Sequence, residues 1–226
     1  MKGPARTGER RRALLGEARL LLVFTPEASG TNDPLAALER ALDAVDAVEV
    51  RPKPAGDARA PTSAREAFDW TLRVLDLCGE RELLVLVNDR VDVARALAER
   101  GCDGVHLGQA DAPPAVAREL LGPELLIGLS THDAAQVVLA TEAPVDYLGF
   151  GPVFPTATKG YGRGLGPERA WIAAEASALP VFPIGGIDLA NAESLERIGR
   201  AAVSSAVLSA PDPLAAARAL RELLTA

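Results

Sequence analysis

Short apolar runs and longer amphipathic segments alternate along this chain, and this alternation restricts the fold more than any other feature of the sequence. The apolar runs show no regular change between polar and apolar residues, so each is predicted to be a strand buried on both faces, which is typical of parallel strands covered by helices. Strands are predicted at Arg19–Phe24, Ala47–Arg51, Glu82–Val87, Gly104–Leu107, Leu125–Leu129, Asp146–Phe150, Pro180–Ile184 and Ala202–Val207. Helices are predicted at Asp33–Val45, Ser63–Cys78, Asp89–Arg100, Pro113–Leu121, Asp133–Ala140, Pro167–Ser177, Ala190–Ile198 and Pro213–Leu224.

This number of strand-helix units in a chain of 226 residues favours a single-domain (β/α)8 barrel. The main alternative is an open, doubly wound sheet of the Rossmann kind. That fold would carry a Gly-x-Gly-x-x-Gly turn after the first strand, whereas residues 24–28 read Phe-Thr-Pro-Glu-Ala. We therefore expect an α/β TIM barrel over residues 19–226. Residues 1–18 are expected to form a flexible N-terminal extension.

Charge and cysteine content exclude several classes of function. The formal net charge is −7 and the basic residues are dispersed, which argues against a nucleic-acid partner. The two cysteines, Cys78 and Cys102, lie in apolar surroundings, so a disulfide framework is not expected. The apolar run Leu20–Phe24 is too short for a signal core or a membrane span. We therefore expect a cytoplasmic protein without a membrane partner.

Two aspartates follow neighbouring predicted strands at the point where each strand ends. Asp89 comes after the third strand, and Asp111 follows the fourth. Because the carboxyl ends of parallel strands meet at one end of a barrel, both carboxylates are expected to face one cavity. Carboxylates this close repel each other unless a cation lies between them. Oxygen ligands on separate loops suit Mg²⁺ with a phosphorylated substrate, so both aspartates are predicted to be metal ligands.

Lysine is rare in this chain, and its positions are therefore informative. Of the 24 basic residues, only Lys2, Lys53 and Lys159 are lysines. Lys53 and Lys159 each follow a predicted strand, where a compact positive charge suits a phosphate group. Glu49, Arg51 and Lys53 occupy alternate positions, so their side chains are expected on one face of the extended segment. The simpler interpretations are ordinary surface lysines, and a pairing of Glu49 with Arg51 or Lys53.

The polar groups after the predicted strands divide into two anion sites. Pyrophosphate, or a similarly charged group, is predicted to be held by Arg51, Lys53, Asn88, Ser130 and Lys159. A single phosphate is predicted to be held by Thr156, Thr158, Gly186, Ser204 and Ser205. Two phosphorylated small-molecule substrates that meet over one cavity imply group transfer.

Some of these residues have structural alternatives. Ser130 and Thr131 are the kind of residues that cap helices, and the second phosphate site could be a glycine turn with two buried serines. His132 could act as a general acid or base, whereas His106 lies inside a predicted strand and is expected to be a satisfied core histidine.

Three motifs in this order resemble those of the thiamine-phosphate synthase family, also called thiamine-phosphate pyrophosphorylase. They are Val-Asn-Asp-Arg at 87–90, Asp-Gly-Val-His-Leu-Gly-Gln-Ala-Asp at 103–111 and Gly-Phe-Gly-Pro-Val-Phe-Pro-Thr-Ala-Thr-Lys at 149–159. The resemblance implies a barrel that joins 4-amino-2-methyl-5-hydroxymethylpyrimidine pyrophosphate to a thiazole phosphate, or to its carboxylate, with Mg²⁺. The products would be thiamine phosphate and pyrophosphate.

The resemblance also implies roles for individual residues. Asp89 and Asp111 resemble the metal ligands, and the second phosphate site resembles the thiazole phosphate site. The residues expected to act in catalysis are Arg51, Lys53, Ser130 and Lys159, and those expected to join them in binding substrates are Glu49, Asn88, Thr156, Thr158, Gly186, Ser204 and Ser205. The resemblance is also compatible with a homodimer.

The sequence departs from the family pattern at several positions. Glu49 stands where the family usually has Gln, the first strand ends Phe24-Thr25-Pro26 instead of the usual Thr-Asp, and Pro183 replaces a small residue. Near Arg200 an expected glycine is missing. Two alternative functions follow: a thiazole tautomerase, a sister barrel that relies on a histidine after strand five such as His132, and a non-catalytic barrel that binds a thiamine precursor.

Overall fold

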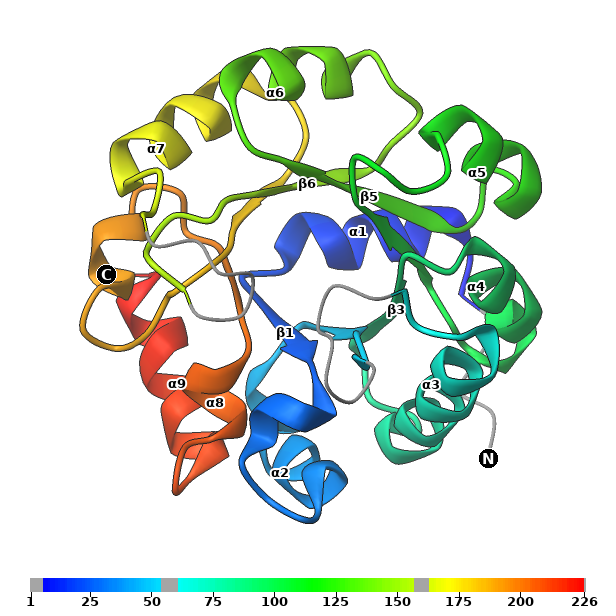
Figure 1. The fold of residues 1–226 in the computed structure, drawn as a ribbon, viewed down its shortest axis with the longest axis horizontal. Helices are drawn as coiled ribbons and strands as arrows, with labels where there is room; N and C mark the ends of the chain where they lie inside the picture. Colours follow the sequence, from blue (N-terminus) through cyan, green and yellow to red (C-terminus); the bar gives the residue numbers. More distant parts are fainter. Residues whose placement is uncertain (1–5, 54–60, 157–162, 226) are drawn as a thin grey trace.

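The predicted strands form one parallel sheet that curls into a barrel (Figure 1). The computed structural model describes residues 6–53, 61–156 and 163–225. The strands are β1 Leu20–Phe24, β2 Ala47–Val50, β3 Leu84–Asn88, β4 Gly104–Leu107, β5 Leu126–Thr131, β6 Tyr147–Phe150, β7 Val181–Pro183 and β8 Ala201–Val203. They pair in the order β7-β6-β5-β4-β3-β2-β1-β8. A parallel bridge between Ile184 and Ala202 links the two ends of the sheet, which confirms the predicted barrel.

Helices surround the strands as an outer ring (Figure 1). The ring contains α2 Pro34–Ala41, α3 Ala64–Cys78, α4 Val91–Leu97, α5 Pro114–Leu121, α6 Ala134–Thr141, α7 Pro167–Ala176, α8 Ser205–Leu208 and α9 Pro213–Leu223. The connecting 3₁₀ turns are η1 Pro26–Ser29, η2 Leu42–Ala44, η3 Ala98–Arg100 and η4 Ala192–Leu195. Side-chain caps begin α2, α3, α6 and α9, at Asp33, Ser63, Asp133 and Asp212. None of the described helices is long and apolar enough to cross a membrane.

Two predicted elements near the C-terminus are wrong. The helix predicted over Ala190–Ile198 is reduced to the 3₁₀ turn η4, because Asn191 and Ser194 bond to nearby backbone carbonyls in place of a regular helical ladder. The strand predicted over Ala202–Val207 ends at Val203, and the next residues form α8. Val207 is fully buried there, and apolarity alone does not distinguish a buried strand from a buried helical turn.

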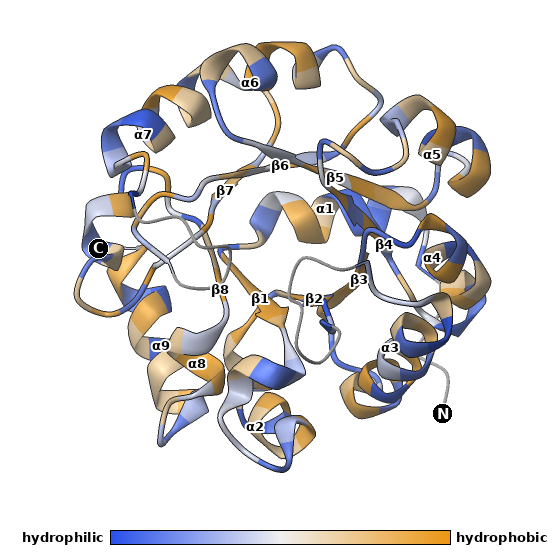
Figure 2. Ribbon diagram, viewed as in Figure 1, coloured by the Kyte–Doolittle hydropathy of each residue, from blue (hydrophilic) through white to orange (hydrophobic). Residues whose placement is uncertain are grey.

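The core has two layers, one on each side of the sheet. Leu21 and Val23 of β1 point into the barrel, whereas Leu20, Leu22 and Phe24 pack against the outer helices. Figure 2 shows the apolar colour along β1 and β5 and mixed colours on the helices. Burial on both faces is therefore the reason that the strands read as continuous apolar runs.

Three aspartates, one directly before each of β2, β4 and β6, bind the start of the preceding strand. Asp46 accepts hydrogen bonds from the backbone N–H of Arg19 and Leu20, at 2.8 and 2.9 Å. Asp103 accepts from Val85 and Asp146 accepts from Ile127, each at 2.9 Å. Each of these strand-start aspartates also forms an ion pair with arginine: Asp46 with Arg221, Asp103 with Arg6 and Arg11, and Asp146 with Arg12 and Arg118.

An additional helix, α1 (Gly8–Glu17), closes the amino-terminal end of the barrel where a flexible extension was predicted. Thr7 caps it, and Leu15 packs into the barrel interior together with Ala18. Arg11 is only 5% exposed, and its Nε lies 3.0 Å from Asp103 Oδ1. Burial raises the pKa of Asp103, and the positive charges of Arg6 and Arg11 oppose that rise.

Replacing Arg11 by Ala should lower the free energy of unfolding by about 2–4 kcal/mol, because it removes one partner of a buried carboxylate. Urea unfolding followed by circular dichroism measures the change. Arg10→Ala is the matched control, since Arg10 pairs with the exposed Glu82, and it should cost less than about 1 kcal/mol. Equal losses in the two variants would show that the ion pair of Arg11 contributes nothing beyond a surface contact.

Candidate active site

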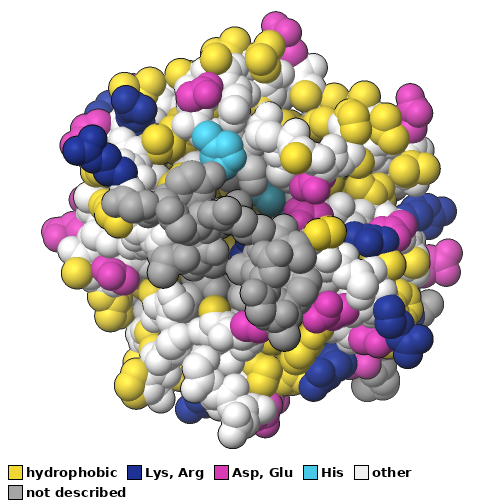
Figure 3. All heavy atoms as spheres, in the orientation of Figure 1, with side chains coloured by type: hydrophobic (Ala, Val, Ile, Leu, Met, Phe, Trp, Pro, Cys, Tyr) yellow, Lys and Arg dark blue, Asp and Glu magenta, His cyan; other side chains and the backbone are white. Residues whose placement is uncertain are grey.

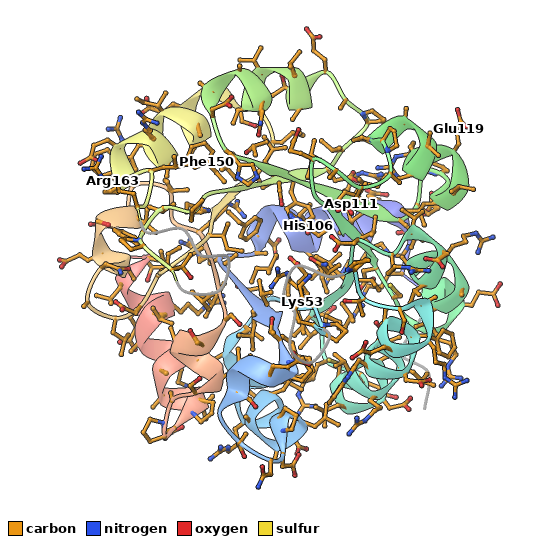
Figure 4. All side chains as sticks on the ribbon, in the orientation of Figure 1. Lys53, His106, Asp111, Glu119, Phe150 and Arg163 are labelled. Carbon is orange, nitrogen blue, oxygen red and sulfur yellow. The ribbon has the colours of Figure 1, made fainter. Side chains whose placement is uncertain are left out.

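A cavity of about 560 Å³ opens at the carboxyl ends of the strands. Every strand contributes to it, directly or through the residues that follow the strand. Figure 3 shows this end of the molecule, with histidine and acidic side chains around the central region. In Figure 4, Lys53, His106 and Asp111 lie toward the centre of the barrel, whereas Glu119 and Arg163 lie at its periphery. The described residues among those predicted to act therefore gather at the end of a barrel where loops can carry chemistry.

The structure places Asp89 and Asp111 side by side, as the order of the strands predicts. Burial, a hydrogen bond with Asp111 and the negative charge of Asp111 raise the pKa of Asp89 to about 6, while the charge of Lys53 acts in the opposite direction. Gly108 donates its N–H to Asp111 Oδ2 at 2.6 Å. Asp89 has a positive φ of 62°, and its N–H donates to the carbonyl of His106 at 2.8 Å. A strained backbone therefore holds one carboxylate against another.

The charged residues near the end of β2 and directly after it lie at the same end of the barrel. Glu49 and Arg51 line the cavity, and Lys53 is 9% exposed. Glu49 is 4% exposed, and within the described residues it forms no ion pair with Arg51. The interpretation of Glu49 and Arg51 as mutually paired ions is therefore not supported.

Asn88 and Ser130 also line the cavity, and Ser130 belongs to a chain of buried polar side chains. His106 Nε2 lies 2.9 Å from Ser130 Oγ, and His106 Nδ1 lies 2.9 Å from the hydroxyl of Tyr147. Gly128 makes room for Tyr147, because a Cβ at this glycine would lie 2.1 Å from Tyr147 Cζ. His106 is a satisfied histidine as predicted, but it also lines the cavity and orients Ser130.

His132 lines the cavity with one ring nitrogen already engaged. Its Nδ1 lies 2.5 Å from the carbonyl oxygen of Gly151. A carbonyl only accepts hydrogen bonds, so Nδ1 carries a proton, and in the neutral ring Nε2 is then an acceptor.

The predicted phosphate site lies partly in the described residues. Thr156, Gly186, Ser204 and Ser205 all line the cavity, whereas Thr158 and Lys159 lie outside the described residues. Gly186 has a positive φ of 65°, and a Cβ there would lie 2.4 Å from the carbonyl oxygen of Pro155. Only glycine fits this close approach between the loops after β6 and β7.

Sequence reasoning missed several residues of the cavity region, among them Thr25 and Tyr147. Thr25 lines the cavity at the end of β1, and the buried Tyr147 supports His106 from below. Both lie at inward positions: Thr25 follows the alternation of Leu21 and Val23, and Tyr147 belongs to the barrel interior. Inward and outward positions alternate along each strand, and this alternation could have indicated both residues. It is hard to recognise in the sequence because both faces of the strands are apolar.

Comparisons with known proteins identify the family to which this chain belongs. The sequence model of the thiamine monophosphate synthase family matches residues 20–210. A thiamine-phosphate synthase of Prochlorococcus marinus (strain MIT 9313) is 40% identical over 224 residues, covering 97% of this chain and 61% of that protein. One from Synechococcus sp. (strain CC9605) is 41% identical over 222 residues, covering 97% and 59% respectively. This chain therefore spans about three fifths of the length of these curated relatives.

A solved structure matches over nearly the full length of both chains. Thiamine phosphate pyrophosphorylase from Pyrococcus furiosus is 32% identical, with a TM-score of 0.76, and the match covers 94% of this chain and 96% of that one. A 3-hexulose-6-phosphate synthase from Salmonella typhimurium shares the fold alone, at 18% identity and a TM-score of 0.66, covering 91% and 98%. The family match and the full-length structural match together place this chain in the thiamine monophosphate synthase family.

Proposed function

We propose that this barrel is a thiamine-phosphate synthase. It would transfer the methylpyrimidine group of 4-amino-2-methyl-5-hydroxymethylpyrimidine pyrophosphate to the nitrogen of a thiazole phosphate, or of its carboxylate. The observation that carries the proposal is the contact between Asp89 and Asp111, with the charge of Lys53 close enough to act on Asp89. Such a group of charges suits a cation and a diphosphate together. Family membership supports the same reaction.

The donor set fits Mg²⁺. No cluster of three or more potential ligands among His, Cys, Asp and Glu occurs in the described parts of the chain, so an all-protein cage is not found there. Mg²⁺ usually binds through one or two carboxylates, with water and substrate phosphate oxygens completing its shell. Asp89 and Asp111 would supply those carboxylates. When bound, the ion would neutralise negative charge on the diphosphate.

The protein's part in the proposed reaction is to position two substrates and to stabilise the leaving group. Arg51, Lys53, Asn88 and Ser130, together with Lys159, would bind the diphosphate through charge-assisted hydrogen bonds. The bond between the pyrimidine methylene and the diphosphate oxygen breaks, and its electron pair leaves with the diphosphate. The aminopyrimidine stabilises the resulting cation, and the thiazole nitrogen then forms the new bond to the methylene carbon. With the carboxylate as acceptor, the carboxyl group would also leave as CO2, and its bonding electron pair would stay on the thiazole ring. No covalent nucleophile of the protein is needed.

The second substrate would lie on the opposite side of the cavity. Its phosphate would be bound by Thr156, Thr158 and Gly186 together with Ser204 and Ser205, and its ring would face the methylene group. Holding both substrates in one cavity replaces a bimolecular encounter by an oriented one.

His132, with an acceptor at Nε2, keeps the tautomerase as a second candidate, although that reaction has no use for the carboxylate pair. A cytoplasmic location and a homodimer remain predictions.

Replacing Asp111 by Ala should lower pyrophosphate release by at least about 100-fold, because the metal would lose one of two carboxylate ligands. The assay uses purified protein, Mg²⁺ and both substrates, with unfolding curves to verify the fold. Glu119→Gln, on the outer ring, is the matched control and should keep full turnover. Binding of both substrates without turnover in the unmodified protein would favour the non-catalytic barrel, and thiazole isomerisation without Mg²⁺ would favour the tautomerase.

A second prediction concerns the stability of the metal-free protein. The pKa of Asp89 is raised from 3.8 to about 6, so the folded state retains a proton that the unfolded state releases as the pH rises through this interval. Asp89 therefore destabilises the fold above pH 6. Asp89→Asn removes the charge and tolerates a positive φ, so it should stabilise the metal-free protein by about 1–2 kcal/mol at pH 7.5, allowing for solvent screening.

This second effect should disappear near pH 4, where the carboxyl group is protonated in the folded state. Thermal unfolding of both proteins with chelator at the two pH values measures it. A variant less stable than the unmodified protein at pH 7.5 would show that the two carboxylates do not repel each other in the folded state.

A further inference from the structure

Two buried side-chain oxygens of the described residues have no hydrogen-bond partner, and both belong to residues that line the same cavity. They are Thr25 Oγ1 and Ser204 Oγ. Thr25 is only 5% exposed. A buried hydroxyl without a partner destabilises the protein that contains it, and such groups are rare in folded proteins. Two of them at one cavity suggest that a ligand supplies the missing partner.

These two hydroxyls belong to the residues that directly follow the neighbouring strands β1 and β8. Leu22 of β1 is paired with Val203 of β8, so Thr25 lies a few residues further toward the cavity mouth than Ser204 on the adjoining strand. Leu21 and Val23 point into the barrel, as does Ala202, and by the same alternation Thr25 and Ser204 point inward as well.

Local structure does not explain the hydroxyl of Thr25. The residue precedes the 3₁₀ turn η1, where threonine often caps the turn with its side chain, but no such bond is formed. Pro26 has no N–H to donate, and the N–H of Ala28 binds the backbone carbonyl of Thr25 at 2.9 Å. The hydroxyl therefore contributes nothing visible to the turn.

We propose that Thr25 is a further substrate-binding residue, whose hydroxyl donates a hydrogen bond to an oxygen of a phosphate monoester beside Ser204. This inference rests on the proposed function and extends its second phosphate site across the barrel closure to β1. Phosphate oxygens accept several hydrogen bonds each, so one group satisfies both hydroxyls. Across the cavity, the loop containing Gly185 and Gly186 lies at the end of β7. Asp188 also lines the cavity, and its Oδ1 accepts from Ala190 at 2.9 Å.

The test is Thr25→Val, which keeps the shape and removes the hydroxyl. The backbone of Thr25 is extended, with φ −111° and ψ 104°, so valine is accommodated without strain. Because an unpaired hydroxyl is removed, the midpoint of thermal unfolding of the ligand-free protein should rise by about 2–4 °C. Calorimetry should show an affinity for the thiazole phosphate about tenfold lower, through loss of a hydrogen bond to a charged group. The affinity for the dephosphorylated thiazole alcohol should stay the same.

Two further variants separate binding from structure. Thr25→Ser keeps the hydroxyl and should keep the affinity for the thiazole phosphate. Thr71→Val removes a buried hydroxyl that is satisfied, because Thr71 Oγ1 donates to the carbonyl of Ala67 at 2.6 Å on α3. It should lower the unfolding midpoint and leave the affinity unchanged. Opposite shifts of stability in Thr25→Val and Thr71→Val support the proposal, since a purely structural hydroxyl would give shifts of the same sign.

The inference fails if Thr25→Val binds the thiazole phosphate as tightly as the unmodified protein, or loses affinity equally for the phosphate and the alcohol. It also fails if the unmodified protein binds no thiazole phosphate. Pyrophosphate release is measured separately: binding that depends on Thr25, without any release, would refute the proposed synthase reaction and retain this phosphate contact. Pyrophosphate release by the unmodified protein, with unchanged affinity for the thiazole phosphate in Thr25→Val, would support the synthase reaction and refute the phosphate contact of Thr25.

Discussion

The rest of the barrel depends on the hydrogen bonds between the three strand-start aspartates and the backbone N–H groups of the preceding strands. Parallel strands have unpaired N–H groups at their starts, and burying them without partners is costly. Asp46, Asp103 and Asp146 accept from these groups and pair with arginines from other elements. The starts of β1, β3 and β5 are thereby fixed to the residues that precede β2, β4 and β6. The opposite end can then present polar and strained residues, which cost stability, without loss of register.

Most of the fold could be predicted from the sequence because both faces of each strand are buried. That burial produces continuous apolar runs, and their number in a chain of this length favours a barrel. Helix α1 was missed because its contacts are largely ionic: Arg11 and Arg12 resemble the solvated arginines of a flexible terminus until Asp103 and Asp146 are seen beside them. The short η4 and the early end of β8 depend on local side-chain bonds that apolar patterns do not report.

The candidate site divides in the same way. The meeting of Asp89 and Asp111 was predictable, because strand order alone brings the ends of adjacent parallel strands together. The hydrogen-bonded chain of Ser130, His106 and Tyr147 could not be predicted, because it depends on the space that Gly128 leaves for the Tyr147 ring. The missing hydrogen-bond partner of Thr25 could not be predicted from the sequence. A hydroxyl is revealed as lacking a partner only when all its neighbours are known.

The barrel has its fewest strand-pairing contacts where β8 closes it against the β7 side. β8 pairs with β1 through Leu20–Ala201, Leu21–Ala202 and Leu22–Val203, and it meets the β7 side through a single bridge from Ala202 to Ile184. Where the even strands β2, β4 and β6 are preceded by aspartate, β8 is preceded by Arg200, which binds carbonyls around the end of α1. A ligand that touches residues from β7, β8 and β1 at once would act as an additional crosslink, so occupancy of the cavity and closure of the barrel should favour each other.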